Sequence, residues 1–543
     1  MNGWKEGQVL RLEITGYAAD GAGVARQEGV VIFVKGALRG EICDVVLEKV
    51  GRSAVWGRAV KVLVPSPARM ESDCPYYETC GGCQLRHMTY SEELALKLGR
   101  VEDALRRIGG LDLGVSVILG SENTKRYRNK VQFPVSDRCG VKAGFYRQRS
   151  HHVIDVEDCL LQPEAATRLR SAAKAWMERY GVSAYDERTF KGLVRHFYVR
   201  TNAEGESLFC LLVNGKKVPH EEELVEALRA AEPGLAGVVL GVNEKKNNVI
   251  LGESYRTLWG EETLTDTLCG LTFRLSVPSF YQVNAPQAQV LYEQALDFAA
   301  LTGKETVLDL YCGIGTISLV MAKRAGEVIG AEVVPQAVDN ARENALRNSV
   351  QNASFLCADA GEAAQTLAEQ GKRPDVICVD PPRKGLSLQV IDAIAAMAPR
   401  RLVYVSCDPG TLGRDLKELT ARGFTAEKAA AVDLFPRTAH VETVVLLSKG
   451  EVDSKKIRVE FSLEDMDMSE FQDGATYPQI KEYVLEHTGL KVSNLYISQI
   501  KRKCGIEVGK NYNLPKSEDS RQPQCPPEKE KAIREALKYY GMI

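Results

Sequence analysis

From about residue 271 the chain alternates between short apolar segments that favour strands and longer segments with helical periodicity. Residues 306–310 and 327–332 have the apolar, β-branched character of buried strands, whereas residues 317–325 and 336–348 have the spacing of helices. Strands and helices that alternate in this way form a parallel sheet covered by helices on both faces. The pattern therefore predicts a doubly wound α/β domain in the C-terminal half of the chain.

A glycine-rich turn follows the first of these strands and predicts a cofactor site. In Gly313-Ile314-Gly315-Thr316 the glycines allow a ligand to approach the backbone, and Glu332, which ends the next strand, can accept hydrogen bonds from ribose hydroxyls. A dinucleotide is the alternative ligand, but the third glycine of the dinucleotide fingerprint is missing. The acidic Asp309 before the turn is typical of methyltransferases.

Two later strands deliver reactive side chains to the same edge of the predicted sheet. One ends in Asp380-Pro381-Pro382, and the next ends in the polar turn Ser406-Cys407-Asp408-Pro409. A cysteine beside a cofactor pocket suggests a thiolate that attacks a substrate before a group is transferred to it. The alternative for Cys407 is a small buried apolar residue. Adenine N-methylation is the alternative chemistry, but Arg383 stands where those enzymes carry an aromatic residue.

Three of the fourteen cysteines crowd into ten residues near the N-terminal quarter of the chain. Cys74, Cys80 and Cys83 flank two glycines that let the backbone fold back, and this spacing suits soft-metal ligation. Cys159, in a polar context, is the predicted fourth ligand. Zinc and an iron–sulfur cluster both fit the spacing, and a set of unpaired structural thiols is the alternative.

Residues 1–66 predict a small β-barrel, with short strands separated by glycine-rich turns. The turn at residues 20–26 and the phrase at residues 34–41 resemble a TRAM domain, which is an OB-like RNA-binding module; a generic barrel is the alternative. The predicted strands are residues 8–14, 30–34, 41–47 and 56–62.

Basic and aromatic side chains alternate in two segments, residues 124–133 and 144–152. On strands this alternation places cations on one face, where they can contact phosphates, and rings where they can stack on unpaired bases. The alternative is a solvated sheet face with the rings turned into the core. Because the net charge of the chain is only -2, we expect RNA affinity to come from such local patches.

The length of 543 residues, with 44% hydrophobic residues, predicts two to four domains. No run of about 18 apolar residues and no apolar signal segment is present, so we expect a soluble, cytoplasmic protein without a membrane partner. After an acidic linker, residues 478–485 and 495–503 predict a helix-turn-helix, residues 511–527 an extended segment, and residues 527–540 a final helix. The basic end of this extension could contact RNA or a partner.

Several motifs together resemble the RNA (uracil-5-)-methyltransferase family, and in particular its 23S ribosomal RNA branch with a TRAM domain and a four-cysteine iron–sulfur site. The resemblance covers about residues 5–450. Its motifs are Ser279-Phe280-Tyr281-Gln282-Val283-Asn284, Asp309-Leu310-Tyr311-Cys312-Gly313, Asp380-Pro381-Pro382-Arg383, Ser406-Cys407-Asp408-Pro409 and His440-Val441-Glu442-Thr443.

This resemblance implies a multidomain α/β protein in five parts. Residues 1–66 would be the OB-like TRAM barrel, residues 67–270 a central α+β RNA-binding domain with the iron–sulfur site, and residues 271–450 a Rossmann-like class I methyltransferase domain that uses S-adenosylmethionine (SAM). Residues 451–473 would be a linker and residues 474–543 a small helical, helix-turn-helix-like extension. The enzyme is expected to act as a monomer.

Carried over by motif, the resemblance also implies the site residues. Thr316 and Asp359 stand where some members of the family carry asparagine. The implied SAM contacts are Gln282, Tyr311, Thr316, Glu332, Asp359 and Asp380; the implied ligands of a [4Fe-4S] cluster are Cys74, Cys80, Cys83 and Cys159; and the expected RNA contacts are Phe280, which would face the target base, with Lys130 and Gln132.

The chemistry explains why a cysteine and a carboxylate are needed. C5 of uracil is a weak nucleophile, so the Cys407 thiolate would add to C6 and make C5 reactive toward the methyl group of SAM. Glu442 would then remove the C5 proton so that the cysteine is eliminated; a solvated strand end is the alternative for this residue. His440 is interpreted as structural. Both faces of the base must be reached, so the uridine should be single-stranded or flipped out.

The expected function is therefore SAM-dependent formation of 5-methyluridine in 23S rRNA. Methylation of the tRNA T-loop is an alternative that would use the same catalytic residues. A non-catalytic RNA-binding iron–sulfur protein is a further alternative, from a different class, but it leaves Cys407 and Glu442 without a role.

Overall fold

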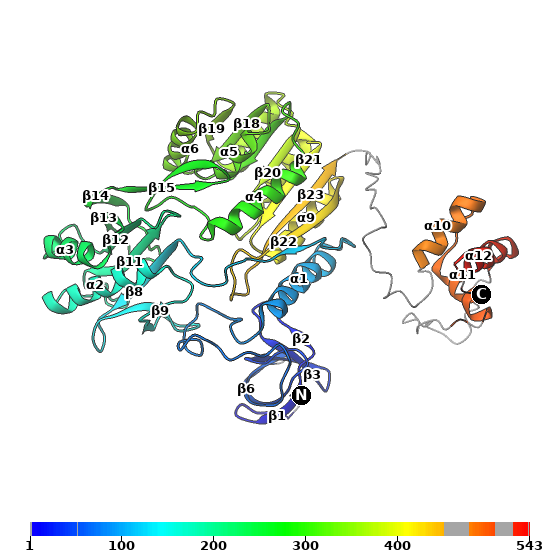
Figure 1. The fold of residues 1–543 in the computed structure, drawn as a ribbon, viewed down its shortest axis with the longest axis horizontal. Helices are drawn as coiled ribbons and strands as arrows, with labels where there is room; N and C mark the ends of the chain where they lie inside the picture. Colours follow the sequence, from blue (N-terminus) through cyan, green and yellow to red (C-terminus); the bar gives the residue numbers. More distant parts are fainter. Residues whose placement is uncertain are drawn as a thin grey trace. The chain divides into compact units, whose positions relative to one another are not determined.

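The computed structural model of the protein describes residues 3–51, 53–449, 477–504, 506, 525–540 and 542. The chain divides into two compact units, Met1–Val452 and Asp453–Ile543, and each is described by itself (Figure 1). The predicted linker at residues 451–473 lies outside the described residues, as does most of the predicted extended segment at 511–527. Within the described ranges, no helix combines the length and the apolar character needed to cross a lipid bilayer.

The N-terminal part of the first unit is a six-stranded sheet in the order β1-β5-β6-β4-β3-β2. Its core is apolar and includes the fully buried Ile32, Val34 and Val45. The predicted turn at residues 20–26 is shorter than expected, because a strand begins at Gly23 and pairs with the following strand. The strands are β1 (Val9–Glu13), β2 (Gly16–Tyr17), β3 (Gly23–Gln27), β4 (Val30–Lys35), β5 (Ile42–Val50) and β6 (Ala54–Val64).

A second sheet, of seven strands, follows in the order β10-β9-β8-β11-β12-β13-β14. Every residue of its two central strands, β11 and β12, is buried. Only part of each basic and aromatic segment forms a strand, since β8 begins at Lys130 and β9 ends at Tyr146. The elements are β8 (Lys130–Ser136), β9 (Lys142–Tyr146), β10 (Val153–Asp155), α2 (Glu164–Tyr180), β11 (Val194–Thr201), β12 (Ser207–Val213), α3 (Glu221–Ala231), β13 (Leu235–Val242) and β14 (Ser254–Gly260).

The third sheet has eight strands in the order β19-β18-β17-β20-β21-β23-β22-β7. Strands β17 to β21 are parallel, as the sequence predicts, but β23 inserts antiparallel between β21 and β22. The strands are β7 (Ile118–Leu119), β17 (Thr306–Leu310), β18 (Glu327–Glu332), β19 (Ala353–Cys357), β20 (Val376–Val379), β21 (Arg401–Ser406), β22 (Phe424–Val432) and β23 (Glu442–Lys449), and a separate hairpin of β15 (Thr263–Leu268) and β16 (Leu271–Ser276) precedes them.

Helices cover both faces of this third sheet, so the doubly wound architecture is confirmed (Figure 1). One face packs against α4 (Ala285–Ala299), α5 (Thr316–Ala322) and α6 (Pro335–Arg347). The other packs against α1 (Tyr90–Arg107), α7 (Ala360–Glu369), α8 (Leu388–Met397) and α9 (Pro409–Ala421).

Two of these elements come from far upstream in the chain. Strand β7 pairs with β22, and α1 contributes Val101 and Leu105 to the buried face. Neither contribution is predictable from the sequence, because neither element carries a pattern that specifies a partner more than 300 residues away.

The second unit consists, within its described residues, of three helices with a core of their own. They are α10 (Tyr477–Thr488), α11 (Asn494–Lys503) and α12 (Pro527–Tyr539), close to the predicted bounds. Ile480, Ile497 and Ile533 are fully buried between them. The prediction of a small helical extension is therefore confirmed.

Candidate active site

The glycine-rich turn after β17 is held tightly against the end of β18. The backbone N–H groups of Tyr311 and Cys312 both donate to the carbonyl of Ala331, and Gly313 N donates to Glu332 Oε2 at 3.1 Å. Tyr311 has a φ of +71°, in the left-handed region that side chains rarely adopt. The turn and the carboxylate that ends β18 therefore form one preorganised edge at which a nucleoside could bind.

Asp309, the last-but-one residue of β17, is fully buried behind this turn. Its Oδ2 accepts a hydrogen bond from Ser318 Oγ at 2.5 Å, while its Oδ1 has no partner among the described residues. Burial raises the pKa of Asp309 to about 7. A buried oxygen without a donor is costly unless a ligand or water supplies one, so Asp309 belongs to the site although it was not among the predicted contacts.

Asp380, Cys407 and Glu442 meet at the ends of neighbouring strands. Ser406 lies opposite Thr443 in the antiparallel ladder of β21 and β23, so continuing the register by one residue places Cys407 opposite Glu442. Burial raises the pKa of Glu442 to about 8 and that of Asp380 to about 7. Burial, together with the negative charges of Glu442 and Asp380, raises the pKa of the Cys407 thiol to about 11.

One cation faces this acidic group. The guanidinium of Arg383 opposes the upward shift in the pKa of both Cys407 and Glu442. Its Nη2 lies 3.3 Å from Nε2 of His440, whose pKa burial and neighbouring cations lower to about 4. Because a guanidinium can only donate, Nε2 of this neutral imidazole is the acceptor and its proton sits on Nδ1. Arg383 and His440 therefore border Cys407 and Glu442, although His440 is predicted from the sequence to be structural.

Of the remaining predicted cofactor contacts, Tyr311 and Asp359 lie near each other, whereas Thr316 and Gln282 have partners of their own. Tyr311 lies close enough to Asp359 for that carboxylate to add to the effect of burial, which raises the pKa of Tyr311 to about 12. Asp359 also caps α7, its Oδ1 accepting from Gly361 N at 2.9 Å. Thr316 Oγ1 lies 3.3 Å from the hydroxyl of Tyr292, and Gln282 is buried beside the second sheet, its carbonyl accepting from Asn129.

Comparison with known proteins decides the family. Residues 205–450 match the tRNA (uracil-5-)-methyltransferase family, and residues 3–60 match the TRAM domain. A protein of Clostridium tetani that is named an uncharacterized RNA methyltransferase is 42% identical over 446 residues, which cover 82% of this chain and 97% of that protein. The chain belongs to the RNA (uracil-5-)-methyltransferase family.

Two further relatives agree with this assignment. An RNA methyltransferase of Halalkalibacterium halodurans, also named uncharacterized, is 42% identical over 442 residues, covering 81% of this chain and 96% of that protein. The solved structure of a Pyrococcus abyssi tRNA (uracil-54, C5)-methyltransferase in complex with S-adenosyl-L-homocysteine (SAH) superimposes with a TM-score of 0.65 at 25% identity, covering 81% of this chain and 100% of that one. This RNA (uracil-5-)-methyltransferase thus depends on SAM, acts on RNA, and carries a TRAM domain formed by its N-terminal sheet.

The methyltransferase presents an aromatic and basic surface beside the Gln282 segment. The side chain of Phe280 is 65% exposed, and the Lys130 ammonium lies 5.9 Å from the centre of its ring. Burial, with the neighbouring cations Arg200 and Arg128, lowers the pKa of Lys130 to about 8. Gln132, two residues along β8, points to the same face as Lys130. The structure therefore brings two of the three predicted RNA contacts together directly, and the third lies on the same strand face.

The four predicted metal ligands of this methyltransferase line one cavity of about 190 Å³. Burial raises the pKa of the Cys80, Cys83 and Cys159 thiols, that of Cys83 to about 12. Gly82 N donates to Cys80 Sγ at 3.4 Å. Across the described ranges, however, no three Cys, His, Asp or Glu side chains are grouped as the ligands of a single metal ion. Cysteines separated by up to 85 residues thus share one cavity, and the identity of any group they hold stays a prediction.

Proposed function

We propose that this protein methylates C5 of uridine in 23S ribosomal RNA through a covalent adduct between Cys407 and C6 of the base. The observation that carries the proposal is the placement of Cys407, directly after β21, and Glu442, at the start of the antiparallel β23, beside the acidic edge that Asp309 and Asp380 form. A nucleophile and a base that lie at the neighbouring ends of two paired strands can act on neighbouring atoms of the same ring.

The residues at this edge fit the cofactor that the family uses. SAM carries its transferable methyl group on a positively charged sulfonium. Asp309 offers an unpartnered buried oxygen, and Asp380 is a partly buried carboxyl group with its pKa near 7 because its surroundings disfavour the charged form. Glu332, Tyr311 and Gln282 would hold the nucleoside and amino-acid parts, with Thr316 and Asp359 as further contacts. The positive charge of SAM would favour the ionised forms of the carboxylates and of Cys407.

Cys407 begins the reaction as the nucleophile. Its thiol, which is partly exposed, loses its proton to solvent, and the thiolate forms a bond to C6 while the electron pair of the C5–C6 double bond moves toward the C4 carbonyl oxygen. The resulting enolate takes the methyl group at C5, and the bond between that methyl group and sulfur breaks. Arg383, the cation beside Cys407, would favour the thiolate.

Glu442 completes the reaction as the base. Its carboxylate removes the proton from C5, the electron pair of the C–H bond restores the C5–C6 double bond, and the bond from C6 to Cys407 breaks to return the thiolate. Glu442 then passes the proton to solvent, so one proton is released for each methyl group transferred. Burial raises the pKa of Glu442 to about 8, within the range in which a carboxyl group can exchange protons near neutral pH, and the positive charge of SAM would favour its ionised form.

The target uridine must leave any duplex for this geometry to work, because the thiolate and the methyl donor approach different faces of the ring. Phe280 is exposed and could stack on the flipped base. Lys130, beside that ring, and Gln132 would contact the RNA backbone next to the base. The TRAM domain would bind flanking RNA.

We further propose that Cys74, Cys80, Cys83 and Cys159 hold a [4Fe-4S] cluster. A single zinc ion needs four sulfur ligands gathered about 2.3 Å from one point. The four cysteines line one cavity of about 190 Å³, and in the cluster that the family resemblance implies each thiolate would bind a different iron. The reaction needs no electron transfer, so the cluster would order the RNA-binding part of the protein.

Metal analysis of protein purified without oxygen tests the cluster. We expect about four iron and four sulfide ions per chain. Zinc in place of iron would show that the four cysteines hold a zinc ion and not a cluster. Cys83→Ser should lower RNA affinity and leave SAM affinity unchanged. A variant with unaltered RNA binding and activity would overturn the ordering role.

The choice of ribosomal RNA over tRNA rests on the combination of a TRAM domain with a four-cysteine site. Methylation of tRNA is the second candidate, because the solved relative from Pyrococcus abyssi is a tRNA enzyme. Labelled SAM should transfer methyl groups to unmodified 23S rRNA, and nuclease digestion with mapping should locate 5-methyluridine at one site or two. Product in tRNA alone would keep the mechanism and replace the substrate.

A further inference from the structure

The segment before Glu442 is a loop held in place by residues from the N-terminal fifth of the chain. This loop, residues 433–441, connects β22 to β23 and is called the 433–441 loop below. Asp433 directly follows Val432, whose Cα lies opposite Glu442 in the ladder. Whatever fixes the two ends of the loop therefore fixes the backbone that carries the proposed base.

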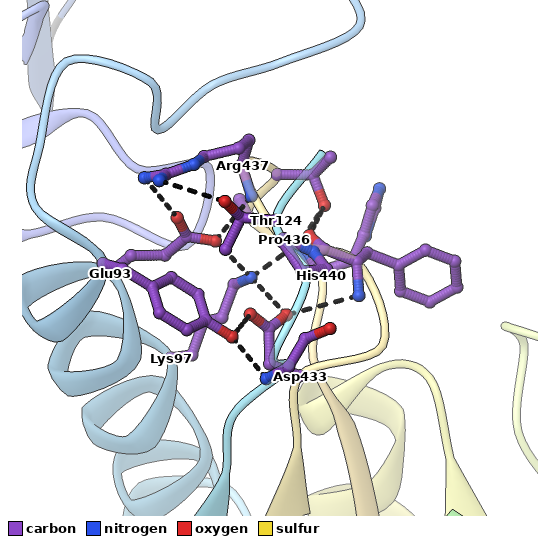
Figure 2. Close-up of polar contacts among 12 residues, drawn as sticks. Glu93, Lys97, Thr124, Asp433, Pro436, Arg437 and His440 are labelled. Carbon is purple, nitrogen blue, oxygen red and sulfur yellow. Dashed lines mark hydrogen bonds and ion pairs between the residues drawn. The ribbon is translucent and has the colours of Figure 1, made fainter. Parts of the chain in front are cut away.

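Two buried charged residues of α1, Glu93 and Lys97, bind the start of the loop, as Figure 2 shows. Lys97 Nζ donates to Glu93 Oε1 at 2.7 Å, to Asp433 Oδ1 at 2.6 Å and to the carbonyl of Phe435 at 3.2 Å. The side chains of Glu93, Lys97 and Asp433 are all 0% exposed. The hydroxyl of Tyr90 donates to Asp433 Oδ2 at 2.8 Å. An ammonium thus satisfies two buried carboxylates that are 340 positions apart in the chain.

The middle of the loop turns at Arg437, whose φ of +70° lies in the left-handed region. This conformation is unfavourable for a residue with a side chain, and surrounding contacts must maintain it. Arg437 N donates to Glu93 Oε1 at 2.6 Å, and its guanidinium reaches Glu93 Oε2 at 3.4 Å (Figure 2). The carboxylate of Glu93 therefore joins the helix to the strained turn.

The segment that follows Cys83 forms hydrogen bonds to the same loop. Gln84, the residue after Cys83, donates its backbone N–H to the carbonyl of Arg437 at 3.0 Å, and Leu85 N donates to that carbonyl at 3.1 Å. The side chain of Gln84 accepts from Ala439 N at 3.3 Å and donates to Gly81 O at 3.0 Å. The loop is thus continuous, through single hydrogen bonds, with the segment that forms the cysteine cavity.

A third set of contacts joins the loop to the reacting groups. Arg100, on α1, donates to the carbonyl of Ala439 at 2.5 Å and lies 3.7 Å from the carboxylate of Asp408, the neighbour of Cys407. His440, the last-but-one residue of the loop, accepts from Arg383. One helix therefore contacts the residue after the nucleophile and the loop that leads to the base.

We propose that Glu93, Lys97 and Gln84 are positioning residues for the second half of the reaction, in which Glu442 removes the C5 proton and Cys407 is released. Buried ion pairs contribute little net stability compared with apolar residues, so a fully buried charge group is better explained by the arrangement that it imposes. This inference rests on the proposed function, because it concerns how the covalent adduct is resolved.

The reaction offers a readout that separates positioning from a general loss of structure. Formation of the adduct needs Cys407 and SAM, whereas its breakdown needs Glu442. A misplaced Glu442 should therefore make the protein–RNA adduct accumulate on ordinary uridine. A variant that is merely less folded would lose adduct formation and turnover together.

Gln84→Ala is the mild variant that tests this, because it removes the acceptor of Ala439 N and leaves the buried charges intact. On 23S rRNA fragments that contain ordinary uridine, we expect the fraction of denaturant-resistant adduct to rise about fivefold to tenfold and turnover to fall by a similar factor. The rate of trapping by 5-fluorouridine RNA should stay within about twofold of wild type. Gln84→Glu keeps an acceptor for Ala439 N and should restore turnover.

Tyr90→Phe, which removes one donor to Asp433, tests the α1 side in the same way and should change adduct accumulation in the same direction. The matched control is Gln289→Ala, which removes a hydrogen bond to Glu293 on the exposed face of α4 and should leave both readouts unchanged. If Gln84→Ala and Tyr90→Phe lost trapping and turnover in parallel, without accumulation of the adduct on ordinary uridine, the positioning inference would be overturned and the proposed function would stand. A wild-type protein that never forms an adduct would overturn the proposed function, and the inference with it.

Discussion

The protein buries two groups of charged side chains, and they are built in opposite ways. Around α1, the ammonium of Lys97 forms ion pairs with both Glu93 and Asp433, so each buried acid has a cationic partner. At the edge of the third sheet, Asp309 Oδ1 has no hydrogen-bond partner among the described residues, and burial raises the pKa of Asp309, Asp380 and Glu442. The first group is complete, whereas in the second the nearby cation, Arg383, hydrogen-bonds to His440 instead of pairing with an acid in the described part of the chain.

The difference shows in the protonation of the two groups. Burial raises the pKa of Glu93, but the Lys97 ammonium opposes that shift. Burial raises the pKa of Asp380 to about 7 and of Glu442 to about 8, with only Arg383 opposing the shift at Glu442. Buried acids without a partner are unfavourable for a structure but suit a site whose ligand brings positive charge. The comparison supports a structural role for the first group and the proposed sulfonium site at the second.

The largest expected effect concerns the nucleophile at the incomplete group. Cys407→Ala should lower methyl transfer by about 10⁴-fold or more, since no other group is placed to activate C5. SAM affinity, measured by calorimetry, should change by less than about threefold, because the cofactor does not bond to the thiol. If this variant retained substantial turnover, the covalent route would have to be abandoned.

The next effect concerns the base. Glu442→Gln should lower turnover by about 10²–10⁴-fold, as expected for the loss of a general base, and leave most of the protein as an adduct with ordinary uridine. Gel electrophoresis under denaturing conditions measures the adduct, and Cys407→Ala/Glu442→Gln provides the control that cannot form it. Lower turnover without an adduct would assign Glu442 a role before bond formation.

At the complete group, removal of the shared cation should lower the stability of the fold, in addition to disturbing the position of Glu442. Lys97→Met leaves Glu93 and Asp433 buried without their partner and should lower the free energy of unfolding by about 3–5 kcal/mol. Replacing all three, as Glu93→Gln/Lys97→Met/Asp433→Asn, should recover most of that loss. Denaturant unfolding of the two variants provides the measurement; equal destabilisation would show that the charges are not mutually dependent.

The smallest effect is a dependence of SAM affinity on pH. The carboxyl group of Asp380, with a pKa near 7, must lose its proton to face the sulfonium. SAM affinity should therefore rise by about tenfold from pH 6 to pH 8 and level off above, where the free protein is already ionised. SAH lacks the sulfonium charge and should show little change. Asp380→Asn should flatten the SAM profile; a profile as steep as wild type would assign the proton to another group.

The sequence predicted the groups that local patterns specify. Strands β17 and β18 have the predicted bounds, because a buried parallel strand is a short apolar run, and the motifs around Cys407 and Glu442 pointed to the chemistry. It did not predict that these two residues would face each other. That proximity depends on β23 inserting antiparallel beside β21, a pairing that no periodicity specifies.

The charge group around Lys97 lay beyond sequence reasoning for a similar reason. Lys97 and Asp433 are 336 positions apart, and each alone resembles an ordinary charged residue. The left-handed conformation of Arg437 was equally hidden, since it occurs without a glycine. Asp309 carries a recognisable signal, an acid before a glycine-rich turn, which is typical of methyltransferases but does not by itself predict a contact with the cofactor.

The most direct test of the central claim is to incubate the wild-type protein with SAM and 23S rRNA fragments that contain 5-fluorouridine, and then to sequence the cross-linked peptide by mass spectrometry. Fluorine at C5 cannot leave as a proton does, so the adduct should persist. We predict one RNA–peptide cross-link, at Cys407, that carries a transferred methyl group. A protein that binds SAM and methylates ordinary uridine but forms no cross-link would contradict the account.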